Sequence, residues 1–254
     1  MGRVDGKVCL VTGGGSGLGR ADAIRLAEEG AKVVVTDVNV AGGEETVSLA
    51  GNGAIFMEQD VANEDRWPEI IKATTDHFGK LNVLVNNAGI VVVATVESTT
   101  TEEWRRIHSI MTDGVFWGMK YGLEAMKANG EPGSIINVSS TAALMGFPPF
   151  FAYAAAKGAV RSMTKSAAVY CQQAGIPVRV NSIHPGGIDT PMIRAGGVVS
   201  DDAPPPAPPP NAPPGPGIGD PVDVANTVLF LASDESKFIN GVELPIDNCS
   251  VIAP

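Results

Sequence analysis

Short runs of apolar, β-branched residues alternate along this chain with stretches long enough to form helices. Several of the runs, at residues 33–35 and 134–138 for example, are almost continuously apolar, as is typical of strands that are buried on both faces. Strands that alternate with helices predict a parallel sheet with helices on both faces, a doubly wound, Rossmann-type α/β fold. We expect strands at residues 7–12, 32–36, 54–58, 81–86, 134–139, 178–183 and 242–246, and helices near 17–29, 42–50, 63–78, 102–129, 152–174 and 221–233.

The domain organisation follows from an even composition. No shift in composition divides the chain and no internal repeat is present, so we expect a single domain over residues 1–254. Residues 203–217 are rich in proline, which fixes φ and lacks an amide donor, so this segment can be neither a helix nor an inner strand. We expect an excursion at about 191–219 that is either a semi-rigid surface segment or a lid over a substrate pocket.

Charge and cysteine content narrow the range of partners. A formal net charge of −10 argues against nucleic acid and anionic lipid. Cys9, Cys171 and Cys249 lie far apart and outside any metal-binding spacing, which predicts reduced thiols and no metal site. The N-terminus lacks an apolar signal stretch, and the longest apolar run, at 81–96, is too short to span a bilayer. We therefore expect a cytoplasmic protein with no membrane partner.

A glycine-rich turn follows the first expected strand and leads directly into a helix. Its sequence, from Thr12 to Gly19, is Thr-Gly-Gly-Gly-Ser-Gly-Leu-Gly. Glycines let the backbone turn tightly and approach a pyrophosphate, whose charge is stabilised by the free amides of the helix N-terminus. A flexible turn would look similar, but the strand before and the helix after favour a phosphate site. The residues expected to bind the cofactor here are Gly13, Ser16, Gly17, Leu18 and Gly19.

Asp37 lies at the end of the second expected strand, twenty residues after Gly17. A carboxylate at this place can accept hydrogen bonds from the adenosine ribose hydroxyls and would repel a 2′-phosphate. Neither Ser16 nor Val38 offers the basic side chain that such a phosphate requires. The alternative is a surface carboxylate that caps the next helix. The pattern favours NAD(H) over NADP(H).

Four motifs in order carry a resemblance to a known family: the glycine-rich turn, Asn86-Asn87-Ala88-Gly89, Tyr153-Ala-Ala-Ala-Lys157 and Pro185-Gly186. With them the chain resembles the short-chain dehydrogenases/reductases from about residue 7 to residue 247. The stretches at 181–185 and 243–248 further resemble bacterial 3β/17β-hydroxysteroid dehydrogenases and bulky-ketone reductases. The resemblance implies an oxidoreductase that interconverts a secondary alcohol and a ketone.

The resemblance also implies which residues surround the cofactor and the substrate. Asp60 and Val61 would flank the adenine, and Ser140 occupies the position of the catalytic serine, thirteen residues before Tyr153. The remaining implied contacts line the cleft and the nicotinamide end: Asn87, Ala88, Gly89, Tyr153, Lys157, Pro185, Gly186, Ile188 and Thr190.

Ser140, Tyr153 and Lys157 suit the reduction of a ketone chemically. Tyr153 and Lys157 are four residues apart and hence on one face of a helix. A lysine cation beside a tyrosine favours the phenolate and would lower the tyrosine pKa from its usual value of about 10. Ser140 can donate a hydrogen bond to the substrate oxygen as negative charge develops there.

Met111 departs from the family pattern, which places an asparagine here that supports a water behind the active-site lysine. A thioether is at best a weak acceptor and cannot donate a hydrogen bond. Ala156, in place of a frequent serine, is a milder departure. Three interpretations of Met111 remain open. The protein relays protons by another route, for example through Thr112 or water; it is a slow enzyme; or it binds NAD without turnover. A related sugar epimerase or dehydratase is disfavoured, because no C-terminal domain for a nucleotide sugar is evident.

The substrate and the assembly state are also expectations at this stage. Arg194 is the one cation near the expected substrate pocket, and we place it at the mouth. Small and apolar residues on the helices near 102–129 and 152–174 indicate a homo-oligomer, either a dimer or a homotetramer. The pocket should favour a small hydrophobic carbonyl or alcohol, because its expected lining is apolar: Ala142, Leu144, Met145, Phe147, Phe150, Phe151, Met192 and Ile193.

Overall fold

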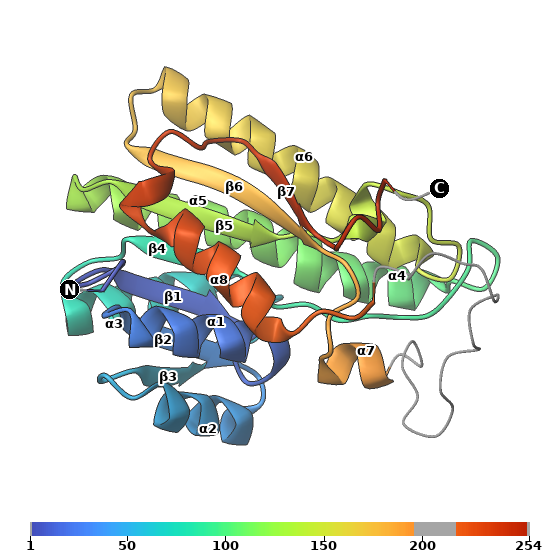
Figure 1. Cartoon of the computed structure of the whole chain (residues 1–254), viewed down its shortest axis with the longest axis horizontal. Coiled ribbons are helices and arrows are strands. Elements are labelled where there is room, and N and C mark those ends of the chain that lie inside the picture. The colour runs from blue at the N-terminus through green and yellow to red at the C-terminus, as the bar shows by residue number, and fades with distance from the viewer. Residues whose placement is uncertain (1, 196–216, 253–254) are drawn as a thin grey trace.

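Seven parallel strands form one sheet in the order β3-β2-β1-β4-β5-β6-β7 in the computed structural model of the chain (Figure 1). All seven expected strands are confirmed, with ends that differ by one or two residues. The strands are β1 (Val8–Thr12), β2 (Lys32–Asp37), β3 (Ile55–Glu58), β4 (Val83–Asn86), β5 (Gly133–Val138), β6 (Val178–Pro185) and β7 (Glu243–Ile246).

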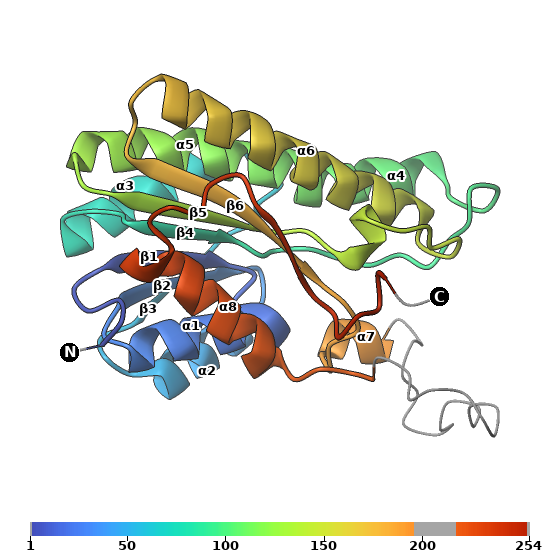
Figure 2. The ribbon, with the colours of Figure 1, turned by 45° about the horizontal axis from the view of Figure 1, so that its top comes forward.

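Helices cover both faces of this sheet (Figure 2). One layer contains α1 (Gly17–Glu28), α2 (Val40–Ala50) and α8 (Pro221–Ala232), and the other contains α3 (Arg66–Phe78), α5 (Gly114–Asn129) and α6 (Phe151–Gln173). The strands are runs of apolar residues because alternate side chains enter different cores on the two faces of the sheet. Val11 and Val35 pack with α1 and α8, whereas Leu10 and Val34 pack with α3 and α5. The doubly wound, Rossmann-type fold is confirmed.

The single helix expected over 102–129 is wrong in one respect, because it is interrupted. Residues Thr101–His108 form α4, Ser109–Asp113 form a π-helical turn, and α5 follows. The Gly114 amide donates to the Ser109 carbonyl, five residues earlier. A Cβ at Gly114 would lie 3.1 Å from the Val61 carbonyl oxygen, so a side chain here would require this loop to move by a few tenths of an ångström. Met111 lies at the centre of the turn and is fully buried.

The structure describes residues 2–195 and 217–252, so residues 196–216 of the excursion expected at about 191–219, most of its proline-rich segment included, lie outside the described residues. Three short elements were not expected: the 3₁₀ turns Thr141–Ala143 and Asp234–Ser236, and α7 (Pro191–Ala195). Within the described ranges, no helix is both long enough and apolar enough to span a bilayer.

Candidate active site

A cavity of about 400 Å³ opens at the carboxyl ends of the strands, beside the point between β1 and β4 where the strand order reverses. This is the edge at which ligands bind in doubly wound sheets. Every residue expected to bind the cofactor or to act in catalysis, except Gly19, lines the cavity: Gly13, Ser16, Gly17, Leu18, Asp37, Asp60, Val61, Asn87, Ala88, Gly89, Ser140, Tyr153, Lys157, Pro185, Gly186, Ile188 and Thr190.

The glycine-rich turn at one end of the cavity is held against the loop after β4. Gly13 has a φ of +65°, and a Cβ there would lie 2.6 Å from the Ala88 Cα, so only glycine fits. The Asn87 Nδ2 donates to the carbonyls of Thr12 and Gly13 at 2.9 and 3.1 Å. The Thr12 hydroxyl in turn accepts from the amides of Asn87 and Ala88. These bonds fix a concave backbone surface in front of the α1 N-terminus, which suits a pyrophosphate.

Gly19 supports this surface without lining it. A Cβ at Gly19 would lie 2.4 Å from both the Asn87 Nδ2 and the Gly13 carbonyl oxygen, and would therefore displace the Asn87 amide. Its place in the motif is explained by close packing of the helix on the turn, which is the role of the last glycine in such motifs.

Asp37 lies at the end of β2 and faces the same end of the cavity. Its carboxylate accepts from the amides of Gly15 and Asn39, each at 2.8 Å. Helix α2 is capped by Asn39, whose side chain accepts from the Gly42 amide, so Asp37 is not a capping residue. Both carboxylate oxygens keep lone pairs that can accept from further donors.

Tyr153 and Lys157 lie one turn apart on α6 and line the same cavity as Asp37. The Lys157 Nζ is 5.7 Å from the centroid of the Tyr153 ring and donates to the Val138 carbonyl at 2.7 Å. The Ser139 hydroxyl donates to the Lys157 carbonyl at 2.9 Å. One hydrogen bond runs from α6 to β5 and the other runs from the residue after β5 to α6. Together they hold the Lys157 ammonium group in place.

Ser140 follows β5 and begins the 3₁₀ turn Thr141–Ala143. Its hydroxyl oxygen accepts from the Ala142 amide at 3.1 Å, which leaves the hydroxyl proton available for a second acceptor. An oxygen that accepts one hydrogen bond becomes a better donor in another. Ser140 can therefore donate to an oxygen that enters the cavity.

The pKa of Tyr153 differs from the expectation. Burial raises it, and a hydrogen bond with Ser140 lowers it by less, so the lysine does not produce the expected decrease. Burial also lowers the pKa of Lys157 to about 8. At neutral pH the phenol is therefore protonated, as a proton donor must be, and the lysine is largely cationic.

Met111 borders this group of residues. A Cβ at Gly89 would lie 3.2 Å from the Met111 Sδ and 3.7 Å from the Lys157 Nζ, so the thioether and the ammonium approach the same point. Met111 also packs with Ala152 and Ala156 of α6. The side chain behind the lysine is thus apolar and fully buried.

The wall next to Tyr153 is apolar, as expected, but three of its expected residues lie elsewhere. Leu144, Met145 and Phe151 do not line the cavity, and Phe151 instead packs near Trp104 of α4, with ring centroids 6.0 Å apart. The expected residues that do line it are Ala142, Phe147, Phe150, Met192 and Ile193. Further residues that were not predicted from the sequence also line the cavity, among them Ile90, Val91, Ile110, Val138, Thr141 and Pro191.

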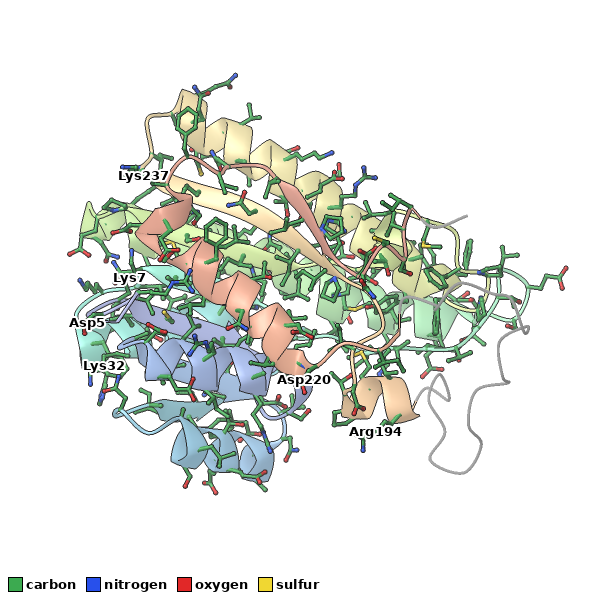
Figure 3. All side chains as sticks on the ribbon, viewed as in Figure 1. Asp5, Lys7, Lys32, Arg194, Asp220 and Lys237 are labelled. Atoms are coloured by element: carbon green, nitrogen blue, oxygen red, sulfur yellow. The ribbon has the colours of Figure 1, made fainter. Side chains whose placement is uncertain are left out.

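Lys157 is the only cationic side chain that lines the cavity among the residues that the structure describes. Arg194 lies on α7 at the outer edge of the molecule, where it forms an ion pair with Asp189 at 2.7 Å (Figure 3). In the same view, Lys7 and Lys32 lie at the opposite end of the strands. The cavity therefore holds no second cation for a substrate carboxylate or phosphate among its described residues.

The three histidines and the three cysteines differ in how deeply they are buried. His77 is exposed, His108 is half-buried, and His184 is fully buried beside Ser140. Cys9 and Cys171 are buried free thiols, and Cys249 is exposed. Among the described residues, no group of three or more metal-binding side chains is present.

Comparisons with known proteins show which family the chain is similar to. A family model described as enoyl-(acyl carrier protein) reductase matches residues 13–248. An NADP-dependent (R)-specific alcohol dehydrogenase of Lentilactobacillus kefiri is 44% identical over 96% of each chain. A 3-beta-hydroxysteroid dehydrogenase of Comamonas testosteroni is 40% identical over 97% of this chain and 96% of that protein. The crystal structure of levodione reductase superposes with a TM-score of 0.88 at 34% identity, over 98% of this chain and 99% of the other.

Proposed function

Because the chain belongs to the short-chain dehydrogenase/reductase family and is an oxidoreductase of alcohols and ketones with a nicotinamide cofactor, we propose that it uses NAD(H) and acts on an uncharged, apolar substrate. Ser140, Tyr153 and Lys157 are the proposed catalytic residues. The observation that carries the proposal is that one cavity is lined both by Asp37, at the end of β2, and by these three side chains, which lie after β5 and on α6, with β1 and β4 between β2 and β5.

The residues of the chain suit each task in the reduction of a ketone. The nicotinamide, when bound, supplies the hydride that reduces the carbonyl carbon. Ser140 donates a hydrogen bond to the carbonyl oxygen and stabilises the negative charge that develops there. Tyr153, protonated at neutral pH, gives its proton to the same oxygen. Lys157 stabilises the resulting phenolate and would hold the ribose hydroxyls at the nicotinamide end. In alcohol oxidation the proton moves the other way.

Preference for NAD(H) is proposed from the charges near Gly15. Asp37 would oppose a 2′-phosphate, and the neighbouring Val38 is 64% exposed and uncharged. The Arg20 guanidinium, which reaches this turn, is already bonded to the Gly15 and Gly42 carbonyls and pairs with Glu45. One relative is named NADP-dependent, so the cofactor cannot be carried over from the family. The charges at this site decide the proposal.

We expect kcat/KM with NADH to exceed that with NADPH by at least about tenfold. The 2′-phosphate of NADPH would lie against the Asp37 carboxylate, and placing two like charges together costs several kcal/mol. Asp37→Asn keeps an oxygen for the Gly15 amide but removes the charge, and should reduce the ratio of kcat/KM with NADH to kcat/KM with NADPH. Adding Val38→Arg should supply a partner for the 2′-phosphate and reverse the preference. The measurement is steady-state ketone reduction with each cofactor. Equal kcat/KM values in the unmodified protein would contradict the assignment.

An apolar substrate is proposed from the wall next to Tyr153. Phe150 lies between Phe147 and Tyr153, with ring centroids 6.1 and 6.2 Å away, so an aromatic surface continues up to the reacting phenol. Such a surface binds flat apolar groups and offers nothing to a carboxylate. A relative named for a hydroxysteroid supports a cyclic alcohol or ketone.

We also propose that α5 and α6 form a contact between copies of the chain. Their outer faces carry exposed apolar side chains, among them Phe116 at 49% and Val169 at 53%. A Cβ at Gly158 would meet nothing within 4 Å, so this part of α6 is open to close packing by a neighbour. Exposed apolar patches of this kind mark protein interfaces. We expect light scattering at micromolar concentration to give a dimer or tetramer of the 26.2 kDa chain, and a monomer would refute the contact.

A further inference from the structure

His184 is a fully buried histidine one residue before the end of β6, and it does not line the cavity. Both of its ring nitrogens have partners. The Nδ1 lies 3.0 Å from the Ser140 carbonyl oxygen, and the Nε2 lies 3.0 Å from the Ser182 hydroxyl oxygen. The ring therefore connects β6 to the residue that follows β5.

The partners determine where the ring proton lies. A carbonyl oxygen can only accept, so the Nδ1 of His184 carries the proton and donates to Ser140. With the Nδ1 protonated, the Nε2 can only accept, and it accepts from the Ser182 hydroxyl. The Val242 carbonyl oxygen, 3.2 Å from the same hydroxyl, competes for its one proton, but this carbonyl also accepts from the Ser182 amide. Burial, the largest effect on the pKa of His184, lowers it. The bond to Ser140 and the charge of Glu243 raise the pKa, and the charges of Arg161 and Lys157 lower it. The ring is accordingly neutral at neutral pH and has a single tautomer.

The main chain of Ser140 is held from several sides. Its carbonyl accepts from the Ala143 amide at 3.0 Å as well as from His184, and its hydroxyl accepts from the Ala142 amide. The amide of Ser139 donates to the Ile183 carbonyl at 2.8 Å. Of these bonds to residues 139 and 140, the one from His184 is the only one made by a buried side chain of β6.

We propose that His184 is a positioning residue: its Nδ1–H fixes the peptide after Ser140, and thereby aims the Ser140 hydroxyl at the substrate oxygen. The effect on rate rests on the proposed function, whereas the tautomer and the bond to Ser140 do not. A displaced catalytic group can cost up to ~10²-fold in rate even when the displacement is about 1 Å.

Two amide substitutions separate the two ends of the ring. In His184→Asn the amide nitrogen can take the place of Nδ1 and donate to Ser140, whereas in His184→Gln the amide reaches toward Ser182 and leaves Ser140 without this donor. We expect His184→Gln to lower kcat for ketone reduction by ~10-fold or more, and His184→Asn to stay within about threefold of the unmodified protein. The Kd for NADH should change little in either variant. Equal kcat values in both variants would overturn the proposal.

A second measurement does not depend on turnover or on the stability of either variant. Nitrogen-15 NMR of the unmodified protein should show the His184 ring protonated on Nδ1 and unresponsive to pH across the neutral range. A ring protonated on Nε2 would overturn the inference directly. If the unmodified protein reduces no ketone but the Nδ1 tautomer is found, the proposed function fails and the bond from His184 to Ser140 stands.

Discussion

Replacing Tyr153 by phenylalanine is expected to lower kcat for ketone reduction by ~10²–10⁴-fold, the range over which general acids contribute. The change removes the hydroxyl group alone, so the ring should keep its contact with Phe150 and the Kd for NADH should stay nearly the same. Initial rates with saturating NADH and titration of cofactor fluorescence measure the two quantities separately.

Tyr121→Phe is a matched control for this substitution. Tyr121 lies on α5, donates to Glu64 at 3.0 Å and does not line the cavity. It should therefore leave kcat unchanged, although the protein again loses one phenol. Ketone reduction at full rate by Tyr153→Phe would show that another group gives the proton.

Met111→Asn is expected to raise kcat by up to ~10²-fold, while the Kd for NADH stays about the same. The thioether now borders the point between Gly89 and the Lys157 ammonium and cannot hold a water there. An amide in its place could anchor a water behind the lysine and speed the return of a proton to Tyr153. Asparagine costs a few tenths of a kcal/mol in helix propensity, and a buried unpaired amide costs ~1–3 kcal/mol.

The test is a paired measurement of kcat and melting temperature, with Met111→Leu as the control. Leucine has a similar size and no polar atom, so it should give no gain in rate. A folded Met111→Asn variant that is no faster would mean that protons reach Tyr153 by another route. Thr112 is poorly placed for that role, because it does not line the cavity and its hydroxyl is 3.0 Å from the His108 Nδ1.

The fold could be predicted from the sequence because its strands are central. A strand buried on both faces, such as β2 or β5, is a run of apolar residues in the sequence. The glycine-rich turn marks the end of β1. The position of the cavity could also be predicted from the arrangement of the strands. Parallel strands bring their carboxyl ends to one edge, so residues that follow different strands, such as Asp37, Asn87 and Ser140, lie around one space.

Features that depend on tertiary packing could not be predicted. The π-helical turn around Met111 occurs where Gly114 passes close to Val61, a contact between residues far apart in the sequence. Phe151 was expected in the pocket as one of the residues that follow the catalytic serine in the sequence. It is the first residue of α6 and instead packs near Trp104. The pKa of Tyr153 depends on how deeply the ring is buried, which spacing along a helix does not reveal.

The most direct test of the account is the absorbance of NADH during incubation of the pure protein with an uncharged cyclic ketone and, separately, with a 2-oxo acid of similar size. We expect loss of NADH with the cyclic ketone and little loss with the oxo acid, because no second cation lines the described part of the cavity. A protein that binds NADH but consumes it with no member of a broad panel of apolar ketones would contradict the account, and would favour a binding protein without turnover.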